Sequence, residues 1–461
     1  MTAPVALEEI RDCLQGIVPA PLATCAADGM PNVTYLSIVQ YVDRERVATS
    51  RQFFNKTRAN LDANPYAEAL VVAPETMAQY TLSLEFLHTE TEGEVFETMR
   101  ANLEAIASQT GMGDVFRLRG VDIYRVVRCE RTGGDGAAEP VRAARADLLE
   151  LLDRYTRRVA QCAGYDETAQ EALHALDDLF GVRHAILLAA DGASGRLFAI
   201  ASSGYPASAV GAEVEPGAGL IGTAAARRRT VGHGNLQRSR TMAAAVTGIE
   251  HPDPREIPLP GLPSARSAVA IALLVGGELL GVLYLESEQA GAFGGDWEPV
   301  LRIVGASVAA ALAARGGGAA EESAAPPADP PAPRGAGGPA ATVSYYQADD
   351  SVLCDGEYIV KGVPGRILWR MLRDHAASGR TQFTNRELRL DETLGLPAGN
   401  DNLEARLLVL RRRLADRACP ITLERVGRGR LQLGLARPLA LEQVATSGPM
   451  RAAYEGRPER G

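Results

Sequence analysis

Hydrophobic and polar residues alternate along the first third of the chain. In the run 79–87, QYTLSLEFL, Leu82 and Leu84 fall on one face and Ser83 and Glu85 on the other. This period of two is that of a half-buried antiparallel strand. Similar runs, bounded by turn residues, occupy residues 22–29, 31–42, 45–50 and 69–74. With a helix expected at 91–108 and a last strand at 121–127, the pattern predicts a small β-barrel.

The middle of the chain begins and ends with apolar residues at helical spacing. Leu148, Leu152 and Val159 mark the first helix, and Val300 and Val304 lie in the last. The strand candidates between them are the runs at 185–191, 197–204, 267–275 and 278–287. Gly276-Gly277 joins the last two as a hairpin. The pattern predicts a central antiparallel sheet with flanking helices.

The last third has a different order of elements. It predicts a strand pair, then helices at 364–376, 384–390 and 402–414, then the hairpin ITLERVGRGRLQLGL at 421–435. On the third helix Leu403, Leu407, Leu410 and Leu414 share one face and can pack into a core. Ala405, Val409 and Arg412 are expected to form the outward ridge, flanked by Arg406 and Arg413.

Composition shifts place the boundaries between these domains. Residues 316–343 are rich in Gly, Ala and Pro and contain almost no large apolar side chain, which is typical of a disordered linker. A weaker break, RTGGDGAAEPV, lies at 131–141. We therefore expect a barrel at 1–130, a sensor domain at 141–315, the linker, a C-terminal domain at 344–440 and a disordered tail at 441–461.

Bulk properties restrict the class of protein. The 461 residues correspond to about three domains, and no apolar run reaches the length that spans a bilayer. The N-terminus carries acids where a secretion signal would be basic, so we expect a cytoplasmic, soluble protein without membrane contact. The six cysteines have no CxxC or Cys/His metal spacing, which predicts no metal site and mostly buried, reduced thiols.

The segment 47–65, VATSRQFFNKTRANLDANP, predicts a strand that leads into a helix whose first turn holds Asn55, Lys56 and Thr57. Backbone N–H groups, a hydroxyl and an ammonium at a helix N-terminus suit a phosphate. Here the sequence resembles the flavin-binding split-barrel family that includes pyridoxamine 5'-phosphate oxidase. By that resemblance the expected FMN contacts are Thr49, Ser50, Asn55, Lys56 and Thr57.

The resemblance has limits that bear on activity. The barrel is short and lacks the arginine-rich C-terminal segment with which the oxidase holds its substrate, so no catalytic residue is assigned. A barrel that has lost its cofactor, with Lys56 and Thr57 only capping a helix, is the alternative. Some relatives of the fold bind haem through a histidine, and His88 ends a strand. A lone histidine there is more often an ordinary surface or core residue, which disfavours haem.

Residues 147–314 resemble a GAF domain, on the stretches 179–191, 215–231 and 260–287 and on the closing helix. In that family a Gly-rich stretch, here Pro216 to Gly222, precedes a helix beside the ligand cavity. The resemblance implies a small-molecule site, with an empty dimerisation spacer as the alternative. A homodimer through the long helices is expected, because their apolar stripes exceed what one domain buries. Charged residues at Leu152 and Val304 are then expected to give monomers.

The C-terminal order of elements resembles the winged-helix DNA-binding domain of OmpR/PhoB-type response regulators. Between Asn402 and Arg437 there are nine arginines against three acids, a surplus of about six that suits phosphate contacts although the whole chain carries −9. The alternative is a basic face of a protein-binding domain. The expected contacts with double-stranded DNA are Arg406, Val409, Arg412, Arg413, Arg428 and Arg430.

Taken together, the sequence predicts a multi-domain fold: an all-β split barrel, an α+β GAF domain and an α+β winged helix. The favoured function is a bacterial one-component transcription regulator that couples flavin or small-molecule sensing to DNA binding. The alternatives are an FMN-dependent oxidoreductase regulated by its GAF domain, and a non-catalytic signalling scaffold. Without a nameable acid or base near the flavin, the regulator is favoured over the enzyme.

Overall fold

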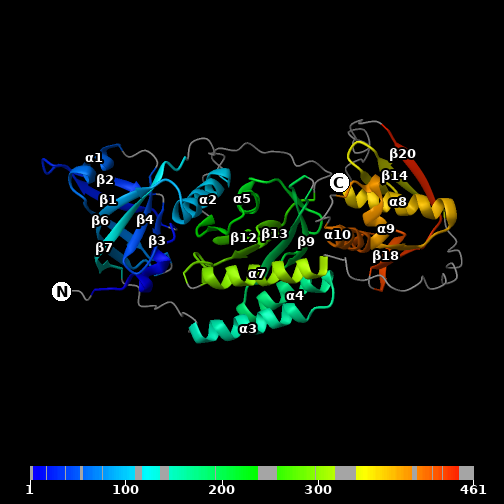
Figure 1. Cartoon of the computed structure of the whole chain (residues 1–461), viewed down its shortest axis with the longest axis horizontal. Helices are drawn as coiled ribbons and strands as arrows, with labels where there is room; N and C mark the ends of the chain where they lie inside the picture. The colour runs from blue at the N-terminus through cyan, green and yellow to red at the C-terminus, as the bar shows by residue number, and fades with distance from the viewer. Residues whose placement is uncertain are drawn as a thin grey trace, which may run out of the picture. The chain divides into compact units, whose positions relative to one another are not determined.

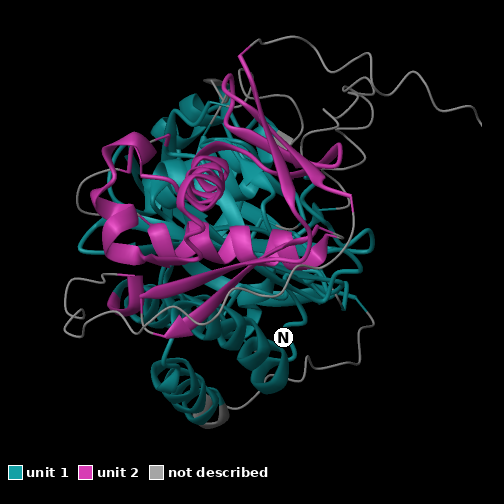
Figure 2. Cartoon of the chain, turned by 90° about the vertical axis from the view of Figure 1, so that its right-hand side faces the viewer, with its two compact units in different colours: residues 1–190, 195–313 teal, residues 191–194, 314–461 magenta. Residues whose placement is uncertain are grey.

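The computed structural model describes residues 4–109, 117–134, 145–236, 257–316, 339–396 and 402–445, except for positions 17, 37, 52–54, 75, 193, 296, 418 and 428. The chain divides into two compact units, coloured separately in Figure 2. The first holds residues 1–190 and 195–313, and the second holds residues 191–194 and 314–461. The expected linker at 316–343 and tail at 441–461 lie largely outside the described residues.

The first domain is a strongly curled seven-stranded antiparallel sheet (Figure 1). After a 3₁₀ helix at Leu7–Cys13, its strands are β1 (Ala20–Cys25), β2 (Pro31–Leu36), β3 (Val39–Tyr41), β4 (Arg46–Arg51), β5 (Tyr66–Val72), β6 (Gln79–Glu90) and β7 (Gly120–Gly133). The spatial order is β2-β1-β5-β6-β7-β4-β3. The edge strands β2 and β3 are consecutive in the chain, so the sheet must curl until its edges meet. This explains the expected barrel, and it splits the single strand predicted at 31–42 in two.

Two helices accompany this sheet, α1 (Asn55–Ala63) and α2 (Glu94–Gln109). The barrel interior is filled by alternating apolar side chains, among them Val47, Leu82, Leu84 and Tyr124. Tyr80 and Phe86 pack against this cluster, which confirms the predicted period of two along β6. A second cluster on the outer side of β4 and β7 joins Ala48 and Ile123 to α2. Strand β4 is therefore buried on both faces.

The second domain is a six-stranded antiparallel sheet with helices on both faces (Figure 1). Its elements are α3 (Arg145–Gln161), α4 (Tyr165–Phe180), β8 (His184–Ala190), β9 (Leu197–Ser203), β10 (Glu213–Val214), α5 (Gly219–Arg227), β11 (Val231–His233), β12 (Ser267–Val275), β13 (Glu278–Ser287) and α7 (Trp297–Gly316). The strand order is β10-β9-β8-β13-β12-β11. Gly276 and Gly277 have φ of 59° and 84°, so the predicted hairpin is confirmed as a turn that needs left-handed residues.

Helix α7 is the one helix among the described residues that is long and apolar enough to cross a membrane, with a mean hydropathy of 1.3. It is also a packing helix of this domain. Val304 and Val308 are fully buried, and a Cβ on Gly305 would come within 2.6 Å of the Ile271 side chain. Its apolar character therefore matches its place against the sheet.

The C-terminal domain contains two small sheets around three helices. Its elements are β14 (Ala341–Tyr346), β15 (Ser351–Cys354), β16 (Glu357–Val360), α8 (Gly362–Ser378), β17 (Gln382–Thr384), α9 (Asn385–Leu390), a 3₁₀ turn at Glu392–Leu394, α10 (Leu403–Asp416), β18 (Ile421–Gly427), β19 (Arg430–Leu435) and β20 (Leu439–Val444). The sheets have the orders β16-β15-β14-β20 and β17-β19-β18. The four leucines of α10 lie in the core cluster, as predicted.

The expected boundaries of this domain, 344–440, are too narrow. Strand β14 begins at Ala341, inside the expected linker, and β20 runs to Val444, inside the expected tail. The two strands pair in parallel from Ala341↔Leu439 to Tyr346↔Val444. This pairing joins the two ends of the domain, which are far apart in the sequence, so no local sequence pattern predicts it.

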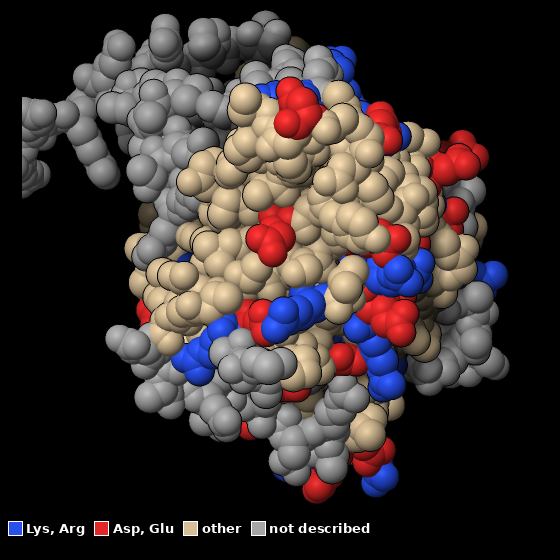
Figure 3. Space-filling view, turned by 90° about the vertical axis from the view of Figure 1, so that its left-hand side faces the viewer, with Lys and Arg blue, Asp and Glu red and all other residues tan. Residues whose placement is uncertain are grey.

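The barrel side of the molecule carries acidic and basic groups in mixture. Figure 3 looks onto this side and shows a broad uncharged area with blue and red groups interspersed around it. Nucleic-acid surfaces need clustered positive charge, so the coloured residues of this face do not suit such a partner.

Candidate functional site

The expected anion site lies where β4 leads towards α1. Lys56, in the first turn of α1, is exposed. The residues between, 52–54, and the side chain of Asn55 lie outside the described part of the chain. The helix has no acidic residue in its first turn, so its N-terminal N–H groups and the Lys56 ammonium reinforce one another as a positive end.

Thr49 and Ser50 are the two expected FMN contacts on β4, and they point to opposite faces of the strand. Thr49 is 2% exposed, faces the barrel interior and hydrogen-bonds the Tyr124 hydroxyl. Ser50 is 1% exposed and shares the other face with Ala48. Its Oγ has no hydrogen-bond partner among the described residues, and a buried hydroxyl without a partner is costly. Only one of the two side chains can therefore face a given ligand.

Thr57 anchors α1 to the sheet. It is 5% exposed, and its Oγ1 accepts a hydrogen bond from Asn32 Nδ2 at 3.2 Å. One turn later Asn60 Nδ2 donates to Thr24 Oγ1 at 3.1 Å. These buried bonds fix the helix on β1 and β2, and the Thr57 hydroxyl keeps its own hydrogen for another acceptor.

Three polar residues that were not predicted from the sequence, Asp122, Thr89 and Arg58, are linked by hydrogen bonds, and Asp122 lies opposite Thr49 in the sheet. The strand register places Asp122 of β7 opposite both Thr49 and Thr89. Thr89 Oγ1 donates to Asp122 Oδ1 at 2.6 Å, and Arg58 Nη1 of α1 donates to Thr89 Oγ1 at 2.8 Å. Asp122 is 6% exposed, and burial raises the pKa of its carboxyl although Thr89 and Arg58 counteract this. A buried acid with a raised pKa is a feature of proton-handling sites.

These residues fit the phosphate of a flavin nucleotide in part. The helix N-terminus and Lys56 supply positive charge, and Ser50 supplies a buried hydroxyl that lacks a partner. Thr49 is already engaged by Tyr124, so its side chain adds least to the set. His88, considered for haem, is exposed and lies 3.3 Å from Glu90 through its Nε2.

The Gly-rich stretch of the central domain leads into α5 as expected, but its helix end already has a partner. Ser108 Oγ, from α2 of the barrel domain, accepts a hydrogen bond from Gly219 N at 2.9 Å and donates to Gly217 O at 3.3 Å. A serine hydroxyl there acts as a cap for the first turn of α5. The Gly219 N–H at this helix N-terminus is therefore already engaged by a neighbouring element.

Helix α2 belongs to the cores of both domains in the first unit. Phe96, Met99 and Leu103 pack in the cluster of the barrel, whereas Ala101 and Ala105 pack in the cluster that contains α5. Polar contacts surround the alanines. Arg227 pairs with Glu104 at 2.6 Å, Arg229 pairs with Glu94 at 2.7 Å, and Gly232 N donates to Asn102 Oδ1 at 3.1 Å. Small side chains allow the close approach of the two helices, and the ion pairs fix their register.

A buried carboxylate orders the other end of the central sheet. Glu286 is 4% exposed and accepts hydrogen bonds from the hydroxyls of Tyr205 at 2.9 Å and Tyr284 at 3.1 Å and from Leu262 N at 2.9 Å. Three donors on one carboxylate compensate for the burial of its oxygens. Burial and Glu286 together raise the pKa of the Tyr205 hydroxyl, so this hydroxyl keeps its proton at neutral pH.

The exposed apolar residues of the long helices differ from those expected at a dimer contact. Leu152 and Val304 are 8% and 0% exposed and pack inside the domain. Leu149 of α3 and Ile303 of α7 are 69% and 47% exposed. The apolar stripes therefore continue onto the surface three residues away from Leu152 on α3 and one residue away from Val304 on α7.

In the C-terminal domain the expected DNA-facing ridge of α10 is not exposed. Ala405 is 0% and Val409 4% exposed, although neither belongs to the core cluster of this domain, and Arg406 is 2% exposed. Arg413 points inward, because its Nε donates to Ile359 O at 3.1 Å, and burial lowers the pKa of its guanidinium. The expected exposure of Arg413 is therefore wrong, whereas the DNA contacts expected at Arg406 and Val409 stay a prediction.

The basic surplus of the domain is largely used within it. Arg417 pairs with Glu357 and Arg437 with Asp355, both at 2.7 Å, and Arg425 pairs with Glu404 at 3.2 Å. Arg412 and Arg430 are half-buried, and Arg428 lies outside the described residues. The net charge of the segment thus overstates the positive surface that it presents.

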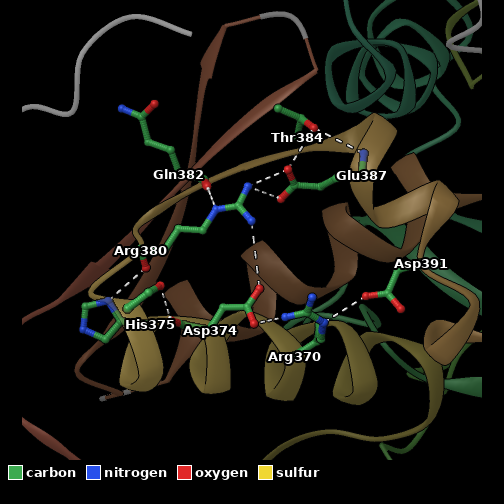
Figure 4. Close-up of polar contacts among 9 residues, drawn as sticks. Arg370, Asp374, His375, Arg380, Gln382, Thr384, Glu387 and Asp391 are labelled. Atoms are coloured by element: carbon green, nitrogen blue, oxygen red, sulfur yellow. Dashed lines mark hydrogen bonds and ion pairs between the residues drawn. The ribbon is translucent and has the colours of Figure 1, made fainter.

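Ion pairs also tie α8 to α9 (Figure 4). Arg380 donates to both carboxylate oxygens of Glu387 at 2.6 and 2.5 Å, and Arg370 pairs with Asp391 at 2.9 Å and with Asp374. Thr384 caps α9 by accepting from Glu387 N. These contacts fix the turn between the helices, which is a structural role.

Comparison with known proteins agrees with the first two domains. Residues 6–124 match the model of the pyridoxamine 5'-phosphate oxidase family, and residues 162–313 match that of the GAF domain. No curated protein matches the chain. Within the described residues, no group of three or more His, Cys, Asp or Glu side chains is placed to hold a metal ion.

Solved structures resemble one domain each. An FMN-binding protein from Syntrophomonas wolfei subsp. wolfei is 18% identical, with a TM-score of 0.24, and covers 28% of this chain and 86% of its own. The GAF domain of an Acinetobacter phosphoenolpyruvate-protein phosphotransferase is 17% identical, with a TM-score of 0.30, and covers 37% and 96%. A free methionine-R-sulfoxide reductase from Neisseria meningitidis is 21% identical, with a TM-score of 0.30, and covers 38% and 94%. By the two family models, the chain combines a pyridoxamine 5'-phosphate oxidase-like domain with a GAF domain.

Proposed function

We propose that the protein is a cytoplasmic one-component regulator in which the barrel and GAF domains sense a flavin or another small molecule and the C-terminal domain binds DNA. The observation that carries this proposal is α2, which contributes side chains to the cores of both sensor-type domains. An element shared in this way responds to a change in either domain, because packed cores do not deform continuously. The two domains then act as one sensor.

FMN is the ligand that the barrel suits best. Lys56 and the N-terminus of α1 would hold its phosphate, with Ser50 as a buried donor at the end of β4. Bound FMN supplies a ring system that changes charge and shape with its redox state. Ser50 and Ala48 lie on the face of β4 that packs towards α2, so occupancy of the site has a direct route to the shared helix.

The visible spectrum and a titration test this input. The purified chain, or the apo-protein mixed with FMN, is expected to show a bound-flavin spectrum with quenched fluorescence and saturable binding. Absence of binding at FMN concentrations up to about 1 mM, weaker than the affinities typical of cofactor sites, would remove the flavin input.

DNA binding is proposed for α10 and the hairpin β18–β19. The order of sheet, three helices and hairpin supports a winged helix of the OmpR/PhoB type, in which the third helix enters the major groove. We propose that the sensed ligand changes the affinity of this domain for DNA.

A matched pair of variants tests the ridge. Arg412→Ala is expected to reduce affinity for a selected site by roughly 10- to 100-fold, the value of one good base contact of about 1 to 3 kcal/mol. Arg389→Ala on α9, outside the ridge, is the control and is expected to change affinity less than about threefold. Equal losses in the two variants would assign binding to general charge and not to α10.

One observation favours a second candidate, an FMN-dependent oxidoreductase. Asp122 is a buried acid that was not predicted from the sequence. It accepts a hydrogen bond from Thr89, which in turn accepts one from Arg58. This candidate requires the cofactor on the Thr49 face of β4 and not on the Ser50 face, and there Asp122 would hold or release a proton. FMN-dependent oxidation of NADH or NADPH by the pure protein, lost in Asp122→Asn while FMN still binds, would establish this function. A rate equal to that of free FMN would exclude these donors.

A further inference from the structure

Two cysteines from distant parts of the C-terminal domain meet at the edge of its core. Cys354 is the last residue of β15 and is 4% exposed. Cys419 lies between α10 and β18, is half-buried, and packs against the core cluster that contains Cys354. The two thiols hydrogen-bond each other, and neither forms a disulfide in this structure.

The surrounding structure holds the two cysteines together from both sides. Arg417, two residues before Cys419, pairs with Glu357 of β16 at 2.7 Å. Arg413 of α10 donates to the carbonyl of Ile359 in the same strand at 3.1 Å. Strand β16 is the hairpin partner of β15, with Cys354 opposite Glu357. The end of α10 is thus fixed beside the strand pair that carries Cys354.

The environments of the two sulfur atoms differ in a chemically useful way. The hydrogen bond with Cys354 lowers the pKa of the Cys419 thiol, and the same bond together with burial raises the pKa of Cys354. The thiolate is the nucleophilic form of cysteine, and Cys419 is the more exposed member. Cys419 is therefore suited to react first, and Cys354 to resolve the product.

From this arrangement we infer that Cys354 and Cys419 are a redox-sensitive pair that forms a reversible disulfide when the protein meets a hydroperoxide. The Cys419 thiolate attacks the terminal peroxide oxygen, the O–O bond breaks, and the leaving oxygen takes up a proton as an alcohol or water. Cys419 is then a sulfenic acid. The Cys354 sulfur attacks the Cys419 sulfur, the S–O bond breaks, and the released hydroxide takes the Cys354 proton as water. Two thiols lose two electrons to one hydroperoxide.

The disulfide would connect β15 to the segment between α10 and the hairpin. It would close a loop that contains α8, α9 and α10. Disulfides in reducing compartments are usually transient and redox-sensing, which agrees with a pair that is reduced at rest. The inference stands independently of flavin and DNA binding.

The full-length reduced chain treated with a few equivalents of hydrogen peroxide tests the inference. The expected product is lighter by two hydrogen atoms, about 2 Da, and regains its mass with dithiothreitol. Peptide mapping without reduction is expected to join the peptides of Cys354 and Cys419. In Cys354→Ser, which keeps a hydroxyl beside Cys419 but cannot form the disulfide, trapping of sulfenic acid at Cys419 by dimedone is expected to rise about tenfold or more over the unmutated chain.

Controls separate the pair from general oxidation. Cys25→Ser changes a half-buried cysteine in the barrel and is expected to leave the disulfide unchanged. Circular dichroism of Cys354→Ser and Cys419→Ser, compared with the unmutated chain, reports whether each variant folds. The inference is overturned if peroxide converts Cys419 of the unmutated chain to a sulfinic acid while Cys354 remains a thiol, or if Cys354 pairs with a different cysteine.

Discussion

At the scale of single residues, the two neighbours Thr49 and Ser50 illustrate how far the sequence leads. Their positions at the end of a strand, ahead of a helix start, could be predicted from local patterns. Their opposite orientations follow from the period of two, and the engagement of Thr49 by Tyr124 depends on strand pairing. Asp122 was missed for the same reason, because only the register of three strands brings it to Thr49 and Thr89.

Lys56 is the exposed charge of the proposed phosphate site. Lys56→Ala removes one charge-assisted contact, worth about 1.5 to 3 kcal/mol, and is expected to weaken FMN binding by roughly 10- to 100-fold in calorimetry. Lys361→Ala in the C-terminal domain makes the same change elsewhere and is expected to have no effect. Unchanged affinity in Lys56→Ala would place the phosphate away from α1.

Because Asp122 is buried, we expect the free energy of unfolding to depend on pH. Burial raises the pKa of its carboxyl in the folded state, so the folded protein favours the protonated form. This favourable contribution is complete below the unfolded pKa of about 3.9 and is lost as pH rises through the folded value. Asp122→Asn, which keeps an oxygen for Thr89, is therefore expected to be more stable than the unmutated protein at pH 7.

Urea unfolding at pH 7 and pH 4 measures this effect. The gain from Asp122→Asn is expected to shrink at the lower pH. A variant that is less stable at pH 7 would mean that the partners Thr89 and Arg58 outweigh burial.

At the scale of elements, the positions of helices could be predicted from the sequence, but the elements against which they pack could not. The amphipathic pattern of α2 indicates a helix at 91–108 and the structure has it at Glu94–Gln109. Nothing in that pattern shows that Ala101 and Ala105 pack on α5 of another domain, since alanine suits any helix surface. The cap that Ser108 gives to α5 is equally invisible in the sequence.

Ala105→Leu tests the shared helix. The added methylenes have no room beside α5, and overpacking of a core costs about 1 to 3 kcal/mol. We expect one thermal transition for the barrel and GAF domains of the unmutated protein and two in the variant. Ala59→Leu, on an exposed position of α1, is the control. A single unshifted transition in Ala105→Leu would remove α2 as a coupling element.

The proposed homodimer depends on exposed positions of α3 and α7. Leu149→Asp together with Ile303→Asp places charges on the surface part of the apolar stripes, and light scattering is expected to report monomers. Leu390→Asp on α9, at an equally exposed leucine, is expected to leave the dimer intact. A monomeric unmutated protein at micromolar concentration would contradict the dimer itself.

At the scale of the whole molecule, shifts in composition predict where the chain divides, and family models match the first two of the expected domains. The edges of the C-terminal domain could not be predicted, since β14 and β20 are joined by a parallel pairing across almost 100 residues of chain. The same limit applies to the basic surplus. The sequence count treats every arginine as a surface charge, but Arg413 donates a hydrogen bond to a backbone carbonyl and Arg425 pairs with Glu404 within the domain.

The central claim is that a sensed ligand controls DNA binding by this chain. Selection of genomic DNA fragments by the full-length protein, with and without FMN, tests it most directly. We predict that a defined sequence is enriched and that its affinity differs at least about tenfold, or 1.4 kcal/mol, between the two states. Failure to enrich any sequence in either state at about 50 mM salt, where electrostatic contacts are strong, would contradict the account.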